Sequence, residues 1–147
     1  MLRAIDRIAA GHDDPRQLRD TLLLDHDERK FPVGLKQGLR GTHIELALPR
    51  GTALRQDDRL VLEDGSLVEV VARPEPLIEA RAGDPAVLAR AAWAVGNMHM
   101  PVELTERRLR VRRSESAADL LRPLGLRLIE IEAPFEPEGG AYHHAHS

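Results

Sequence analysis

The hydrophobic pattern of the first half of the chain is that of short β-strands. In THIELAL (42–48), leucine and isoleucine alternate with other residues, as expected of a half-buried strand. RLVLEDGSLVEVV (59–71) contains two such runs joined at Asp64-Gly65, a dipeptide that favours a tight hairpin. Further strands are expected at 2–8 and 21–24, and no helix is predicted. We therefore expect residues 1–73 to form a small β-sandwich or barrel.

The pattern changes at residues 74–76, Pro-Glu-Pro. The two prolines remove two backbone donors and favour extended geometry, which predicts a linker between two domains. A strand is expected next, at 77–82. Asp84-Pro85 then provides an N-cap and a first-turn proline for a helix, and Gly96 is positioned to end it. His99 is therefore expected just beyond a helix end.

The remaining pattern completes a second domain. Its predicted elements are two short strands within 102–112, a helix at 116–125 and a strand at 126–132. Ser116 and Asp119 are spaced like a capping box, and Pro123 is expected to kink or end the helix. The resulting order, β-α-β-β-α-β, predicts a ferredoxin-like domain over 77–134 and an α+β fold class. Residues 135–147 are rich in proline, glycine and polar residues that leave nothing to bury, which predicts a flexible tail.

Composition narrows the classes of function. With 42% hydrophobic and 31% charged residues, and no apolar run of about 20 residues, the chain is expected to be globular and not to span a membrane. Its N-terminus lacks the features of a signal peptide, so a cytoplasmic location is expected. A net charge of −3 and only four aromatic residues argue against a nucleic-acid partner. The arginine-rich segment 106–113 predicts a strand with a solvated basic face.

The chain contains no cysteine, so any transition-metal site needs imidazole, carboxylate, thioether or backbone ligands. The sequence also has no HExxH motif, no glycine-rich phosphate loop and no Gly-x-Ser-x-Gly elbow. It therefore predicts a protein without enzymatic activity.

Histidines are the strongest candidate ligands. Three of the seven lie in segments where a solvated surface position is expected, namely His12, His26 and His43. Three others lie within four residues of each other near the C-terminus, a composition typical of metal capture by neutral imidazoles. These tail histidines are His143, His144 and His146.

The seventh histidine, His99, lies between two methionines in GNMHMP (96–101). One imidazole cannot hold a metal tightly, but the two-fold axis of a homodimer would bring two copies of His99 together. Met98 and Met100 offer a rival site, because thioethers select Cu(I). In an extended segment, however, both methionines point away from His99, which favours packing methionines.

The chain resembles the UreE family of urease accessory proteins, whose members are nickel metallochaperones. The segments that carry the resemblance are LDHDERK (24–30), LPRGTALRQDDRLVLEDG (48–65), PEPLIEARAGDPAVLARAAWAVGN (74–97), GNMHMPVEL (96–104), LRPLGL (121–126) and EAPFEPEGGAYHHAHS (132–147).

The resemblance implies an N-terminal β domain that contacts partner proteins and a C-terminal ferredoxin-like domain that dimerises and binds Ni(II). By position, His99 matches the motif histidine that meets its symmetry mate in the dimer, and the tail histidines match the region that completes or feeds that site. The implied partners are the urease accessory GTPase UreG and the complex that matures the urease apoprotein. Two departures are Met98, where the family usually has a basic residue, and residues 110–117, which lack the histidines of some relatives.

Three hypotheses follow. A nickel metallochaperone would bind one ion per dimer at His99 and deliver it for assembly of the urease active site. A protein-interaction adaptor would dimerise without any need for metal. A copper or zinc buffer would use the same histidines with a different metal preference, and binding of Cu(I) would need Met98 and Met100.

Overall fold

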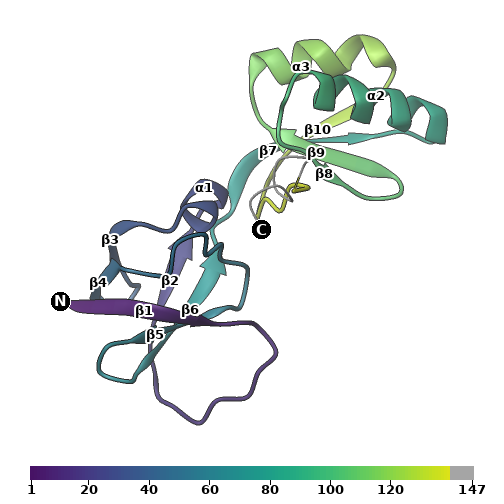
Figure 1. The fold of residues 1–147 in the computed structure, drawn as a ribbon. Coiled ribbons are helices and arrows are strands. Elements are labelled where there is room, and N and C mark those ends of the chain that lie inside the picture. The colour runs from purple at the N-terminus through teal and green to yellow at the C-terminus, as the bar shows by residue number, and fades with distance from the viewer. Residues whose placement is uncertain (140–147) are drawn as a thin grey trace. The chain divides into compact units, whose positions relative to one another are not determined.

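The computed structural model describes residues 1–139, and the chain divides into two compact units, Met1–Arg73 and a second that begins at Pro74 (Figure 1). The first unit is built almost entirely of strands, and the second combines strands with helices, which confirms the α+β class. The elements of the first unit are β1 (Leu2–Ile8), β2 (Leu18–Leu24), α1 (His26–Lys30), β3 (Gly34–Gln37), β4 (His43–Leu46), β5 (Arg59–Leu62) and β6 (Leu67–Ala72).

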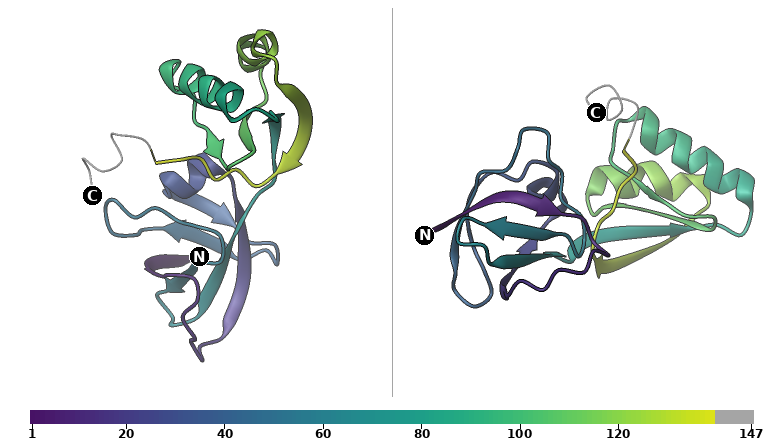
Figure 2. Two further views of the ribbon diagram at one scale, coloured as in Figure 1. Left: turned by 90° about the vertical axis from the view of Figure 1, so that its right-hand side faces the viewer. Right: turned by 60° about the horizontal axis from the view of Figure 1, so that its bottom comes forward.

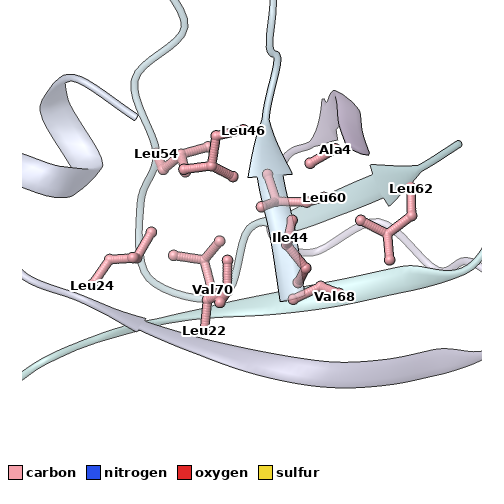
Figure 3. Packing of buried hydrophobic residues seen from close by; sticks show 10 residues of the cluster. All are labelled: Ala4, Leu22, Leu24, Ile44, Leu46, Leu54, Leu60, Leu62, Val68 and Val70. Carbon is pink, nitrogen blue, oxygen red and sulfur yellow. The ribbon is translucent and has the colours of Figure 1, made fainter. Parts of the chain in front are cut away.

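The six strands of the first unit form one sheet in the order β2-β6-β5-β1-β4-β3. The pairs β1–β4 and β2–β6 are parallel, and the other pairs are antiparallel. Leucine and isoleucine side chains of β2 and β4, which lie towards opposite ends of this order, share one buried aliphatic cluster (Figure 3). The sheet therefore curls around its own core, and the hairpin predicted at Gly65 joins β5 to β6 with a positive φ of 86°.

A buried carboxylate closes this curled sheet. Asp20 of β2 accepts hydrogen bonds from the backbone N–H groups of Arg40 (2.9 Å) and Thr42 (3.1 Å), in the loop between β3 and β4. The Leu39 N–H donates to the Thr21 carbonyl (2.9 Å), so this loop also contacts the backbone of β2. Any side chain at Gly38 would collide with the Asp20 carboxylate. These contacts bring the two ends of the sheet together.

The prediction that this half contains no helix is wrong at α1. Asp25 caps the helix by accepting from the Glu28 N–H (2.8 Å), and the Glu28 side chain accepts from the Asp25 N–H (3.1 Å). This reciprocal pair is a capping box, whose spacing is visible in the sequence. A helix of five residues is too short to produce a hydrophobic period, so the strand-like pattern around it was the stronger signal.

The second unit has the predicted order β-α-β-β-α-β, with a short 3₁₀ turn after its second helix. Its elements are β7 (Glu75–Arg81), α2 (Pro85–Asn97), β8 (Glu103–Leu104), β9 (Arg108–Arg112), α3 (Glu115–Leu121), η1 (Arg122–Leu124) and β10 (Arg127–Ala133). The sheet order is β10-β7-β9-β8, with antiparallel neighbours throughout. Because β7 begins at Glu75, two of the three residues assigned to the linker belong to this strand.

Both helices lie on one face of the sheet (Figure 2) and pack on the aliphatic side chains of β7 and β9. The Asp84 cap of α2 is confirmed, because its carboxylate accepts from the Ala86 N–H (2.9 Å). Helix α3 is capped by Ser114 and not by Ser116, and it ends before Pro123 as expected. No helix within residues 1–139 is long and apolar enough to cross a membrane.

The opposite face of the sheet carries a network of ion pairs, so the prediction of a solvated basic face on β9 is wrong. Glu79 of β7 is only 4% exposed, and its carboxylate accepts hydrogen bonds from Arg81 (2.8 Å) and Arg110 (3.0 Å). Arg108 lies 3.5 Å from the same carboxylate and 3.4 Å from Glu103 of β8. Arginines of β9 therefore neutralise a buried acid on the neighbouring strand.

The chain does not leave the second unit at the end of β10. Phe135 is fully buried, with the guanidinium of Arg112 5.5 Å from the centre of its ring. The expectation that nothing is buried in the tail, residues 135–147, is therefore wrong at Phe135. One aromatic ring in a polar context gives no periodic signal, and its contact lies on a strand distant in the sequence.

The ion-pair network predicts an acid-sensitive second unit. Burial alone would raise the pKa of Glu79, but the hydrogen bonds from Arg81 and Arg110 outweigh it and leave the pKa below its ordinary value. Such a carboxyl stabilises the fold above its unfolded pKa of about 4.3, and this contribution is lost as pH falls through the lower, folded value. We expect Glu79→Gln to lower the free energy of unfolding at pH 7 by about 1–3 kcal/mol, measured by urea unfolding.

The matched control is Glu106→Gln, which removes the same charge from an exposed position in the β8–β9 turn. It should leave the free energy of unfolding within about 0.5 kcal/mol of the parent value. The difference between Glu79→Gln and the parent should shrink below about pH 4, where the parent carboxyl also becomes protonated. A difference independent of pH would contradict an electrostatic role.

Candidate metal centre at the end of helix α2

Helix α2 ends later than its glycine predicts. Gly96 lies inside the helix, which continues to Asn97 and has Met98 as its C-cap. The left-handed conformation that usually follows a helix is adopted by His99, with a φ of 57°. The prediction that Gly96 ends the helix is therefore wrong, while the expected position of His99 just beyond the helix end holds.

Two hydrogen bonds fix the backbone at His99. The His99 N–H donates to the Gly96 carbonyl (3.0 Å), and the Met100 N–H donates to the Val95 carbonyl (3.2 Å). This is a Schellman motif, in which the left-handed residue is usually glycine. A side chain there costs about 1 kcal/mol, although histidine is among the residues that tolerate the conformation best. Backbone strain of this kind concentrates at functional positions.

The three side chains of Met98, His99 and Met100 lie in different environments. His99 is exposed, and Met98 is 57% exposed. Met100 packs against the hydrophobic core of the second unit, directly after the left-handed residue of the Schellman motif. The segment is a tight turn rather than an extended strand, so the geometry assumed for the methionines is wrong, and the packing role holds for Met100 but not for Met98.

The outer face of α2 leading to His99 is nearly uncharged. The exposed residues of this helix are Pro85, Ala86, Ala89, Arg90, Trp93, Gly96 and Asn97. Trp93 is 71% exposed. A solvated helix normally carries several charges on its outer face, whereas exposed aromatic and small apolar residues are typical of an interface. Sequence reasoning missed Trp93.

The other histidines within the described residues belong to the first unit. His12 and His43 are exposed, as expected. His26 is not, because it begins α1 with a side chain only 18% exposed and its Nδ1 3.5 Å from Asp27 Oδ1. No group of three or more His, Asp or Glu side chains in residues 1–139 is arranged to hold a metal. His143, His144 and His146 lie outside the described residues.

The geometry predicts that His99 is retained at some cost in stability. His99→Gly relieves the left-handed strain and should raise the free energy of unfolding by about 1 kcal/mol, whereas His99→Ala should not. Thermal unfolding of the metal-free protein measures both. Gly96→Ala is the companion variant, because a Cβ at this helical position meets no atom within 4 Å and should add about 0.5–1 kcal/mol. A destabilised His99→Gly would show that the imidazole itself holds the fold.

Two family models match the two halves of the chain. A family model described as the N-terminal domain of the UreE urease accessory protein matches residues 2–73, and one described as its C-terminal domain matches residues 75–147. The two matches therefore fall on either side of residue 74.

Curated relatives named urease accessory protein UreE are similar along most of the chain. The protein of Bradyrhizobium sp. (strain ORS 278) is 48% identical over 99% of this chain and 70% of its own length. That of Rhodopseudomonas palustris (strain HaA2) is 51% identical over 86% of this chain and 59% of its own length. That of Beijerinckia indica is 45% identical over 87% of this chain and 78% of its own length. The chain thus spans between 59% and 78% of these relatives.

Both halves of the chain match this one family, in the order in which the two units occur. The resemblance stated from the sequence segments is therefore confirmed. The chain belongs to the UreE family of urease accessory proteins.

Proposed function

We propose that the protein is a nickel metallochaperone that binds Ni(II) between two copies of His99 and delivers it in the cytoplasm for assembly of the urease active site. The observation that carries this proposal is the exposed imidazole held in a strained turn at the end of α2. Membership of the urease accessory family supports the choice of nickel and of urease.

The outer face of α2 supports a homodimer. Trp93 and Met98 are both largely exposed, and burying them against a second copy would remove apolar surface from water. In a two-fold interface the same patch meets itself, so an exposed histidine beside the axis approaches its symmetry mate. The dimer would then supply two imidazoles to one ion, although each chain contributes a single histidine to the motif.

An incomplete site suits a carrier. Imidazole is a good ligand for Ni(II), and two imidazoles leave coordination positions for water, for tail histidines and for the ligands of an acceptor protein. A site with open positions can exchange its ion by stepwise ligand replacement. The ion is cargo in this proposal, and the protein performs no reaction of its own. The same donors would also bind Zn(II) or Cu(II) in vitro, with cellular availability deciding the metal carried.

The first unit has a surface suited to a partner protein. Phe31, Val33, Leu35 and Leu39 are each 66–70% exposed, and they lie between the end of α1 and the loop after β3. We call these four residues the apolar strip. Residues 29–40 include no acidic residue. Acidic side chains approach this segment from neighbouring residues, because Lys36 donates to Glu28 (2.7 Å) and Leu35 is paired with Glu45 of β4. In this proposal the strip docks the urease accessory GTPase UreG within the complex that matures the urease apoprotein.

Calorimetric titration of Ni(II), with the mass in solution recorded alongside, tests the metal site. The parent protein should bind close to one ion per dimer, and His99→Ala should lose this binding because both imidazoles disappear together. Met98→Leu, a neighbouring exposed position that keeps its apolar character, is the matched control and should retain the stoichiometry.

The same titrations between pH 7 and pH 5 should show affinity falling as the pH is lowered, because protons compete with the metal for the imidazole nitrogens. Retained binding in His99→Ala would assign the metal to the tail alone. If the protein dimerises equally with and without nickel, and dimerisation does not need the histidines, the adaptor function would be favoured. A requirement for Met98 with Cu(I) would favour copper buffering.

Substitution of the apolar strip tests the docking role. Leu35→Asp places a charge where a partner would bury an alkyl side chain, and it should weaken binding to purified UreG by about tenfold or more. Nickel stoichiometry should not change. The control is Leu18→Asp at the start of β2, where the leucine is 41% exposed and lies outside the strip. Equal losses in both variants would show a general effect of surface charge.

A further inference from the structure

The sulfur of Met98 is an exposed donor atom that neither the fold nor the nickel site uses. Met98 is 57% exposed, although methionine normally fills gaps in apolar cores. Its backbone has a structural role, because the Met98 N–H caps α2 by donating to the carbonyls of Ala94 (3.2 Å) and Val95 (3.2 Å). This cap is made by the backbone, so the sulfur remains accessible.

Met98 and His99 lie on one turn and not on one strand. Met98 has a φ of −87° and a ψ of 6°, and His99 follows with a φ of 57°. Neighbouring side chains of an extended strand point to opposite faces, which would exclude a shared site. That exclusion does not apply where the chain turns. Both residues are exposed and their Cα atoms lie about 3.8 Å apart, whereas Met100 packs on the hydrophobic core.

The donors that this segment offers are neutral. Residues 85–102 include no acidic residue. Glu103, the next acidic residue along the chain, is paired with two arginines of β9, and Glu138 contacts Val102 through its backbone N–H (2.8 Å). Hard cations prefer carboxylate and carbonyl oxygens, whereas thioether sulfur selects Cu(I), and imidazole also binds copper. The donor set of this turn therefore favours a soft ion.

We propose that the homodimer also binds Cu(I), through the sulfur of Met98 and the imidazole of His99 from each copy. This inference rests on the proposed function, because it uses the same two-fold arrangement and the same imidazoles. Neighbouring side chains on a helical turn diverge, so one copy alone holds an ion poorly. A two-fold axis beside these residues brings the donors of both copies together.

The two kinds of donor divide the metals between them. Nickel binds through the imidazoles and gains little from thioethers, which are soft ligands. Cu(I) needs the sulfur, so Met98 is the residue that decides whether the site accepts this ion. Copper buffering is then a second activity of the same turn, alongside nickel delivery, and the cellular supply of each metal sets which one is carried.

Two methionine substitutions in the full chain provide the test. Met98→Leu removes the exposed sulfur and keeps an apolar side chain for the interface. Met100→Leu removes a sulfur from the same segment that packs on the core, and a swap of similar volume there is usually tolerated. Each protein competes with a chromogenic chelator for Cu(I) without oxygen, and its mass in solution is recorded. Met98→Leu should weaken Cu(I) binding by about tenfold or more, whereas Met100→Leu should match the parent.

Two further measurements separate the sulfur from the imidazole. X-ray absorption at the copper edge should show a sulfur ligand in the parent that Met98→Leu lacks. Titration with Ni(II) should give the parent stoichiometry and affinity in both methionine variants, whereas His99→Ala should weaken the binding of both metals. Every variant keeps residues 140–147, so any contribution of that segment is common to all of them.

Several outcomes would overturn the proposal. Met98→Leu could bind Cu(I) as tightly as the parent, or Met98→Leu and Met100→Leu could lose the same affinity, which would indicate an effect through packing. Weaker nickel binding in Met98→Leu would also overturn it, because the sulfur would then not distinguish the two metals. Failure of the proposed function is distinct, since His99→Ala would then bind nickel like the parent whatever its behaviour with Cu(I).

Discussion

The turn at the end of α2 is the constraint on which the candidate site depends. The hydrogen bond from the Met100 N–H to the Val95 carbonyl reverses the chain and places Met100 on the core. Because Met100 packs on the core, His99 faces solvent, and the Val102 carbonyl just before β8 accepts a hydrogen bond from the Glu138 N–H. A helix one turn longer would displace the imidazole, the start of β8 and this hydrogen bond together.

Local chemistry explains what the sequence could and could not predict. Asp84 and Pro85 specify the start of α2 within two residues, so this end was predictable. The other end was not, because Gly96 is the stronger local signal and only the packing of Met100 shows why the helix passes it. Helix α1 was detectable from the spacing of Asp25 and Glu28 but too short to have a period. The role of Asp20 depends on a loop distant in the sequence, which no local pattern reports.

The two faces of the second sheet serve different purposes because they are built from different chemistry. One face is aliphatic and binds both helices, which gives the unit a core independent of charge. The other is organised around Glu79 and the arginines of β9. Residues 134–139 contact the unit there through contacts that include the Phe135 ring near Arg112 and the hydrogen bonds from the Glu136 and Glu138 N–H groups to Glu103 and Val102. Alternation along β9 predicted this division, but not the acid on β7 that pairs with its arginines.

The position of Glu138 has a practical consequence for handling the protein. Its N–H donates to Val102, three residues after the candidate ligand His99. A polyhistidine tag added after His143, His144 and His146 would add imidazoles to those of the protein, and metal titrations would then count the tag. Met1 is 74% exposed, so a removable tag can be placed before it.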